Sequence, residues 1–422
     1  MLEISRVKEQ KEEIIELLKI RSFDAKQIIE DVLSLDLKWR ETKGELDDVS
    51  AESNKIAKEI GMLFGQGKVE EANAERAKTV DLKERSKSLN EMVIDLAHQI
   101  TNKLYEIPNV PNKIVPLGNS DADNEVIFED APEVKLPKDA LPHWELAKKH
   151  DLVDFEMGVK VTGAGFPFYT GKGARLQRSL INFFLDQARD YGYKEIIPPF
   201  LVNEASGIGT GQLPDKEGQM YYSKADDLYL IPTGEIPITN MFRDVIVKEE
   251  DFPIRVTGYT PCFRRESGSY GKEVRGLNRL HQFDKVEIVR IEHPDKSYEA
   301  LDDMVGYVES LLKKLELPYR KLKLCGGDLG FTAALTYDLE VYSAAQKMWL
   351  EVSSVSNFET YQANRLKLRF KDENKKNRLA HTLNGSALAL PRILASILEN
   401  NQTENGINIP KVLVPYTGFE KI

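Results

Sequence analysis

From Thr260 to Ile291 the chain reads TPCFRRESGSYGKEVRGLNRLHQFDKVEIVRI, and alternate positions of this stretch carry charged or aromatic side chains. A period of two places Arg264 and Glu266 on one face of a first strand. A connection of about a dozen residues follows, rich in Gly, Ser and charge, which is typical of a hairpin loop. The β-branched and apolar residues at 286–289 favour strand over helix for the return segment. On one face of that second, antiparallel strand we expect Arg279, His281, Phe283, Lys285 and Glu287.

So many charges are seldom gathered on one face of a sheet unless something compensates them. The pattern therefore has two interpretations. One is a binding face for a charged ligand, and the other is a solvated surface laced with ion pairs. The spacing alone does not separate them.

The composition describes a protein with a large core and a strongly charged surface. The chain has 422 residues, of which 41% are hydrophobic and 30% charged, so we expect two or three domains. A net charge of −10 argues against a protein that coats nucleic acid through its overall charge, although a local basic surface remains compatible with it.

The sequence also predicts a compartment. It holds no apolar run long enough for a membrane span, and its N-terminus lacks the apolar core of a signal peptide. Cys262 and Cys325, the two cysteines, are far apart and form no CxxC pair. We therefore expect a reduced, cytoplasmic setting, with neither a disulfide framework nor a zinc site and with no membrane partner.

A heptad seam predicts a long helical arm near the N-terminus. A short amphipathic helix over 5–18 precedes it, and apolar positions then alternate at spacings of three and four. The pattern stops at two glycines in 65–67 and resumes through Leu82, Leu89, Val93, Leu96 and Ile100. The first half of the seam comprises Val32, Leu35, Trp39, Thr42, Leu46, Val49, Ser53, Ile56, Ile60 and Leu63.

Two matched arms around a glycine turn favour an antiparallel coiled-coil hairpin within one chain, each arm roughly 50–60 Å long. The alternative is a coiled coil that joins two chains, the commoner use of such seams. Residues 108–135 are rich in Pro, Asn and Asp and are interpreted as a linker or surface loop. We thus expect an N-terminal domain over 1–107, a linker over 108–135 and an α+β domain with an antiparallel sheet over 136–422.

Within the third region, apolar spacing predicts a helix over 175–189 and strands over 191–202, 228–238 and 337–355. The strand over 191–202 contains Pro198-Pro199, which places it at an edge, a bulge or an interface, and the strand over 228–238 is broken by residues 232–235. Residues 385–400 predict a helix after an apolar approach, where Pro391 is tolerable only near the start.

Common nucleotide motifs are absent. The run Gly207 to Gly211 has three glycines but no strand and helix around it, and the chain has no GxxxxGK[ST] loop. A nucleotide would have to be held another way. An aromatic ring and Arg392 could enclose an adenine, a strand Arg could hold a phosphate, and Glu351 with Ser354 could hold Mg²⁺.

The chain resembles the class II aminoacyl-tRNA synthetases, whose three motifs can all be traced in it. The first ends at Pro198-Pro199 and implies a homodimer interface. The second matches Phe263 to Glu266 together with Arg279 to Phe283, and the third matches Gly385 to Arg392.

Longer strings are similar to the seryl-tRNA synthetase family within that class. They are GTGQLP at 209–214, PTGE at 232–235, TPCFR at 260–264, HQFDKVE at 281–287, TYDLEV at 336–341, EVSSVSN at 351–357 and HTLNGSALA at 381–389. The helical arm also matches, so the resemblance spans essentially the whole chain.

The resemblance implies an ATP site and a serine pocket. Arg264 and Arg392 would be catalytic, Arg264 holding the α-phosphate, while Phe283 and Arg392 would face the two sides of adenine. The ATP site would comprise Arg264, Arg265, Glu266, Leu280, Phe283, Glu351, Val352, Ser353, Ser354 and Arg392. The serine pocket would comprise Thr233, Gly234, Glu235, Arg264, Lys285, Glu287, Asn384 and Ser386. Glu351 and Ser354 would coordinate Mg²⁺.

The implied enzyme is an ATP-dependent ligase that forms seryl-adenylate and transfers the seryl group to the 3′ end of tRNA(Ser), with tRNA(Sec) also allowed by the resemblance. The arm would bind the tRNA across the dimer. Two other functions are compatible with such a core: activation of an amino acid for a carrier protein, and a coiled-coil regulator with an inactive synthetase domain. The complete arm argues against the first and the intact motifs against the second. His281 has no role in this scheme.

Overall fold

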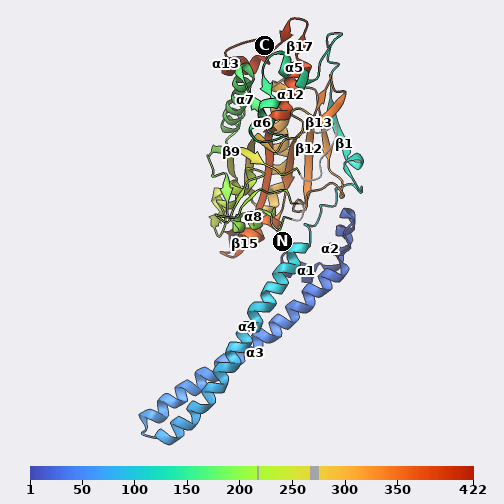
Figure 1. The fold of residues 1–422 in the computed structure, drawn as a ribbon. Coiled ribbons are helices and arrows are strands. Elements are labelled where there is room, and N and C mark those ends of the chain that lie inside the picture. The colour runs from blue at the N-terminus through green and yellow to red at the C-terminus, as the bar shows by residue number, and fades with distance from the viewer. Residues whose placement is uncertain (216–217, 267–274) are drawn as a thin grey trace. The chain divides into compact units, whose positions relative to one another are not determined.

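The computed structural model describes residues 1–215, 218–266 and 275–422, which fall into two compact units (Figure 1). The first unit comprises residues 1–19 and 23–108, and the second comprises residues 20–22 and 109–422. Within the described ranges, no helix is both long and apolar enough to cross a bilayer.

The first unit is the predicted helical arm. Helices α3 (Lys26–Gly65) and α4 (Val69–Glu106) lie antiparallel, joined by a turn in which Gly67 has a φ of +75° (Figure 1). The predicted seam is confirmed, since every one of its positions in both helices is buried or half-buried. The expected helix over 5–18 is instead two helices, α1 (Ile4–Glu9) and α2 (Lys11–Leu18), with a break at Gln10.

The arm has a thin core along its seam. Leu46, Val49 and Leu89 form one small buried cluster, Val32 and Ile56 are also buried, and the other seam positions are half-buried. Ion pairs on the flanks supplement it, among them Arg85 with Glu45 at 2.5 Å and Lys103 with Asp31 at 3.6 Å. A rod of this kind has room for neither an enclosed cavity nor a thick core, so its contribution is length and surface.

The second unit is built on an eight-stranded sheet in the order β1-β11-β12-β13-β16-β10-β9-β4. All neighbours pair antiparallel except β4 with β9, which confirms the predicted α+β class. Its strands are β1 (Glu125–Asp130), β4 (Lys194–Glu195), β9 (Ile254–Phe263), β10 (Gln282–Glu292), β11 (Tyr319–Lys323), β12 (Leu335–Ser343), β13 (Met348–Asn357) and β16 (His381–Ala389).

Three long helices pack on the sheet: α7 (Gly171–Asp190), α10 (Ser297–Lys314) and α12 (Leu390–Asn400). The first confirms the helix predicted over 175–189. The last begins at Leu390 and has Pro391 in its first turn, where a missing N–H costs no helical hydrogen bond. Residues 385–389, which precede it, belong to β16.

The quoted stretch forms the predicted antiparallel pair, but with shorter strands. Phe263 ends β9 and pairs with Gln282, the first residue of β10. Arg264, Glu266, Arg279 and His281 therefore lie in the connection and not on a strand face, which corrects the expected alternation. Glu266 has a φ of +48°, a conformation that no strand contains. Residues 267–274 of the expected hairpin loop lie outside the described residues.

Two other expected strands are wrong in part. The segment 191–202 holds only β4 and β5 (Leu201–Val202), because Pro198 and Pro199 between them have no N–H to donate. The segment 228–238 holds β7 (Leu228–Leu230) and then the helix α9 (Glu235–Asn240). In the segment interpreted as a linker, β1 pairs with β11 at the edge of the sheet.

Candidate active site

A cavity of about 620 Å³ opens on the large sheet of the second unit. Its walls come from the ends of the β9–β10 connection, from β10, β12, β13 and β16, and from the first turn of α12. The predicted site residues that line it are Thr233, Glu235, Arg264, Glu266, Leu280, Phe283, Lys285, Glu287, Glu351, Val352, Ser353, Ser354, Asn384, Ser386 and Arg392.

Two predicted residues do not line the cavity. Arg265 has an exposed side chain, and its backbone N–H donates to the Gln219 carbonyl. Gly234 lies beneath the wall, where a Cβ would come within 3.0 Å of Thr260 Oγ1 and 3.3 Å of Glu287 Cβ. Gly234 thus permits the close approach of α9 to β10.

One end of the cavity is a buried polar cluster, which we call the acidic pocket: Thr233, Glu235, Lys285, Glu287, Asn384 and Ser386. Lys285 Nζ lies 2.5 Å from Glu287 Oε2 and donates to Thr233 Oγ1 at 2.8 Å. The Thr233 hydroxyl in turn donates to Glu287 at 3.1 Å. Strand register sets Ser386 directly opposite Glu287, so β10 and β16 together present the pocket.

Glu235 is the second carboxylate of the acidic pocket. Burial, and secondly the nearby Glu287, raise the pKa of the Glu235 carboxyl to about 7. Gln362 Nε2 donates to it at 2.6 Å and Gln212 Nε2 at 3.2 Å. Neither glutamine was predicted as a site residue. Gln212 belongs to the GTGQLP string and was within reach of sequence reasoning, whereas nothing in the sequence around Gln362 signals it.

The other end of the cavity combines an aromatic ring with guanidinium groups. The Arg264 guanidinium lies 5.1 Å from the centre of the Phe283 ring, and its Nε donates to the Pro232 carbonyl at 3.3 Å. Arg392 donates from Nε to the Asn278 carbonyl at 2.9 Å and from Nη1 to the Glu351 carbonyl at 2.6 Å. Both arginines are therefore fixed by backbone oxygens.

Asp338 is a site residue that sequence reasoning missed, although it stands in the TYDLEV string. It is buried, lines the cavity and pairs in register with Ser354 on β13. Burial, and then the neighbouring Glu351, raise the pKa of Asp338 well above its usual range. Its Oδ1 has no hydrogen-bond partner among the residues that the structure describes.

His281, which had no predicted role, joins the two limbs of the β9–β10 connection. Its Nδ1 donates to the Arg264 carbonyl at 2.9 Å, and its ring stacks on Phe166 at 5.3 Å. Its backbone N–H donates to the Gly165 carbonyl at 2.8 Å. The residue therefore anchors the backbone that carries Arg264.

The fold and the cavity belong to a class II tRNA synthetase core, as a family comparison shows. A family model described as the tRNA synthetase class II core domain (G, H, P, S and T) matches residues 220–401, and one described as the seryl-tRNA synthetase N-terminal domain matches residues 1–111.

Individual proteins match the whole chain. The serine–tRNA ligase of Salinibacter ruber is 50% identical over 424 residues, covering 100% of this chain and 99% of that one. The crystal structure of seryl-tRNA synthetase from Pyrococcus horikoshii complexed with ATP is 34% identical with a TM-score of 0.91, covering 100% of this chain and 99% of that one. The cytoplasmic serine–tRNA ligase of Naegleria fowleri in complex with AMP is 29% identical with a TM-score of 0.86, covering 100% and 98%. The chain belongs to the seryl-tRNA synthetase family.

The raised pKa of Glu235 predicts how stability depends on pH. Because the folded pKa lies above the usual 4.5, the stability associated with the protonated carboxyl is complete below 4.5 and is lost as pH rises through about 7. Glu235→Gln removes this titration. Thermal unfolding should therefore show the stability of the variant rising relative to that of the wild type between about pH 4.5 and about pH 7. Parallel curves for the two proteins across that range would contradict the assignment.

Proposed function

We propose that this chain is an ATP-dependent serine–tRNA ligase that activates L-serine as seryl-adenylate and transfers the seryl group to the 3′ end of tRNA(Ser). The observation that carries the proposal is one cavity in which the buried acidic pocket meets the Phe283 ring and two arginines. The full-length match to a serine–tRNA ligase supports the same reaction.

The ring end of the cavity is the proposed ATP site. Phe283 offers one face to the adenine and the Arg392 guanidinium offers the other, a combination of stacking and cation–π attraction. The edge of the adenine would face Glu266, Leu280 and the backbone around them. Arg264 then leaves the Phe283 ring for the α-phosphate, which its planar fork can hold through two hydrogen bonds.

The chemical step needs charge stabilisation more than proton transfer. The serine carboxylate attacks the α-phosphorus, and negative charge grows on the equatorial oxygens as pyrophosphate leaves. A fixed guanidinium near that position favours the transition state over the ground state. Arg264 suits this role because its backbone is hydrogen-bonded to His281, and its guanidinium would be fixed by the phosphate that it holds.

The residues around Asp338 fit a divalent cation. Asp338 has an orphan carboxylate oxygen, and Glu351 and Ser354 stand beside it. The described ranges contain no cluster of three or more His, Cys, Asp or Glu side chains that could hold a metal ion by themselves. Phosphate oxygens and water would therefore complete the coordination of Mg²⁺. Glu351 and Ser354 would hold the ion, with Asp338 behind them. Mg²⁺ would supply neutralisation of phosphate charge.

The acidic pocket is the proposed serine site. Glu287 and Glu235 would receive the substrate ammonium, and Ser386 with Asn384 would bond the hydroxyl. A pocket that bonds a hydroxyl rejects alanine, because its own polar groups would otherwise stay unpaired. Thr233 and Lys285 hold Glu287 in place before serine arrives.

Replacing Glu287 tests the serine site. Glu287→Ala should lower kcat/KM for serine by about 10- to 100-fold in serine-dependent pyrophosphate exchange, the usual cost of a lost hydrogen bond to a charge, while KM for ATP changes little. Glu292→Ala is the matched control, since Glu292 forms a similarly buried pair with Arg290 on the same strand but does not line the cavity. Intact exchange in Glu287→Ala would refute the pocket.

The arm is the proposed tRNA-binding element. We propose a tRNA-binding domain over 1–107, a linker over 108–135 and a catalytic domain over 136–422. An arm with a thin core and both charge signs suits recognition of RNA shape through the backbone and the 2′-hydroxyls. A carrier-protein ligase or an inactive regulator would have no use for such a reader joined to an intact site. Since tRNA charging serves translation, the proposed compartment is the cytoplasm.

Removing the arm separates the two steps of the reaction. The two helices lie side by side near the Lys103–Asp31 ion pair, so residues 29 and 101 can be joined by a short glycine linker. Deletion of residues 30–100 should abolish charging of bulk tRNA while pyrophosphate exchange stays within about two-fold of wild type. Charging that survives the deletion would show that the arm does not read tRNA, and loss of both activities would assign it to folding.

The proposed enzyme is a homodimer that uses the segment around Pro198-Pro199. Ile197, Phe200 and Leu201 in this segment are 87%, 37% and 46% exposed. Such a run of exposed apolar side chains is typical of a surface that a partner covers. The proposed partner is a second copy of the chain, with the tRNA bound across the dimer.

Light scattering tests the dimer. Ile197→Asp should convert the dimer to a monomer at micromolar concentration, because it places a charge in an apolar contact. Leu117→Asp is the control, since Leu117 is 77% exposed but lies outside this segment. A monomeric wild type, or a dimer that persists in the Ile197 variant, would contradict the proposal.

A further inference from the structure

The first turn of α5 (His143–Lys149) holds the return limb of the β9–β10 connection, residues 275–281. The Arg275 guanidinium lies 4.8 Å from the centre of the Trp144 ring and 3.7 Å from Glu145. The Leu277 backbone N–H donates to His143 Nε2 at 2.8 Å. Gly276 fits so closely that a Cβ there would lie 2.2 Å from the same nitrogen.

The His143 ring has one defined protonation pattern. A backbone N–H can only donate, so Nε2 is an acceptor and the ring proton sits on Nδ1. That proton is donated to Glu399 Oε1 at 2.7 Å, and both side chains are fully buried. His143 therefore links α12 to the return limb: its ring donates to Glu399 on α12 and accepts from the Leu277 backbone N–H.

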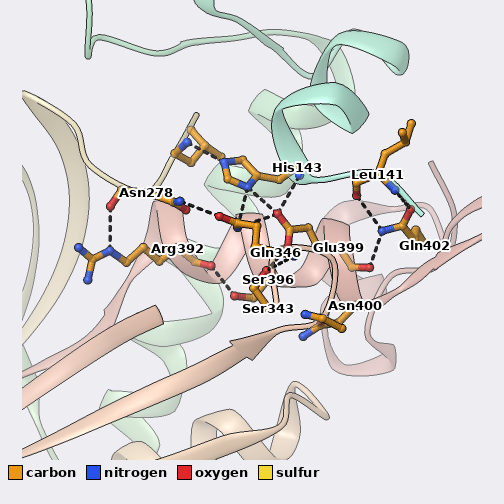
Figure 2. Close-up of polar contacts among 12 residues, drawn as sticks. Leu141, His143, Asn278, Ser343, Gln346, Arg392, Ser396, Glu399, Asn400 and Gln402 are labelled. Atoms are coloured by element: carbon orange, nitrogen blue, oxygen red, sulfur yellow. Dashed lines mark hydrogen bonds and ion pairs between the residues drawn. The ribbon is translucent and has the colours of Figure 1, made fainter. Parts of the chain in front are cut away.

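Glu399 is the hub of this network (Figure 2). Its Oε1 accepts from the His143 backbone at 2.8 Å and from Gln346 Nε2 at 2.9 Å, and Ser343 donates to its other oxygen. Gln346 also accepts from Asn278 Nδ2 at 2.8 Å. Two routes thus lead from one buried carboxylate to adjacent residues of the return limb, one through His143 and one through Gln346.

Both routes end at Arg392. The Asn278 carbonyl accepts from Arg392 Nε at 2.9 Å, so the position of this peptide sets the plane of the guanidinium (Figure 2). Arg392 and Glu399 lie seven residues apart on α12, which places them on the same helix face. The return limb is held between the start and the end of one helix.

We infer that His143 is a positioning residue for the nucleotide site, acting through the Leu277 and Asn278 backbone to orient the Arg392 guanidinium. The inference rests on the proposed function, because it takes Arg392 as one wall of the adenine site. The decisive atom is the Nε2 acceptor. Without it the Leu277 N–H is buried and unpaired, and the limb moves to find another partner.

Two substitutions separate the nitrogens of the ring. In His143→Gln the longer side chain places an amide oxygen near the position of Nε2 and keeps the acceptor for Leu277. In His143→Asn the shorter side chain reaches only as far as Nδ1, keeps a donor for Glu399 and loses that acceptor. In pyrophosphate exchange, His143→Asn should raise KM for ATP by about 5- to 50-fold, while His143→Gln stays within about three-fold of wild type. KM for serine should hardly change in either variant.

Gln402→Ala is the matched control. Gln402 donates to the carbonyls of Leu141 and Glu399, next to the network but off both routes to Asn278 (Figure 2). It should lower thermal stability without raising KM for ATP. Amide hydrogen exchange at Leu277 should accelerate in His143→Asn and stay slow in Gln402→Ala. If His143→Asn is insoluble, Gln346→Ala interrupts the second route from a half-buried position, and a raised KM for ATP is again expected.

Arg392→Ala separates this inference from the function beneath it. A raised KM for ATP in Arg392→Ala with an unchanged one in His143→Asn would overturn the inference and leave the adenine site standing. An unchanged KM in Arg392→Ala would overturn the proposed adenine wall and the inference with it. If His143→Asn and His143→Gln raise the KM for ATP equally, or if Gln402→Ala raises it as much, His143 serves only stability.

Discussion

The ion pair between Lys285 and Glu287 is the constraint around which the second unit is arranged. Both side chains are less than 10% exposed and stand two positions apart on β10, in the interior of the eight-stranded sheet. Removing two charges from water costs several kcal/mol for each ion, and mutual attraction repays that cost only when every remaining hydrogen-bonding atom is satisfied. Thr233 meets this demand because it accepts from Lys285 and donates to Glu287.

Satisfying that pair requires elements distant in sequence. Thr233 precedes α9, Ser386 is on β16, and Gly234 has no Cβ that would hold α9 away from β10. Apolar residues in these positions would cost less desolvation free energy on folding. The buried polar cluster is therefore best explained by a ligand that it binds. The sequence of the β9–β10 stretch was compatible with a ligand-binding face or with a solvated surface of ion pairs. Each interpretation holds for part of it: Glu266 and Arg279 pair with each other, while Lys285 and Glu287 are buried in the acidic pocket.

The local parts of the fold could be predicted because local periodicity decides them. The arm, its glycine turn and the helix after Ala389 follow from spacings within a few residues. Strand ends could not be predicted, since the positive φ of Glu266 and the prolines at 198 and 199 act on hydrogen bonding that a period of two does not reveal. The strand expected through 238 became α9 because its N-terminus packs on β10, which is a tertiary contact.

The same distinction holds for the site. Residues in strings typical of the family were predicted together and line one cavity. Asp338 and Gln362 were missed because their roles arise from register and packing: Asp338 meets Ser354 only across β12 and β13, and Gln362 reaches Glu235 only through α11 (Thr360–Leu366). A histidine such as His143, far from any motif, carries no signal in the sequence at all.

The network around Glu399 connects residues outside the cavity to Arg392, which lines it. Four donors surround its carboxylate, so the group is held in one orientation. A carboxylate with this many hydrogen bonds is held rigidly, because moving it would leave several buried donors unpaired at once. The return limb is connected to the Glu399 carboxylate through His143 and through Gln346. The Asn278 carbonyl connects the same limb to Arg392. The orientation of the Arg392 guanidinium therefore depends on buried hydrogen bonds around Glu399 as well as on the residues that line the cavity.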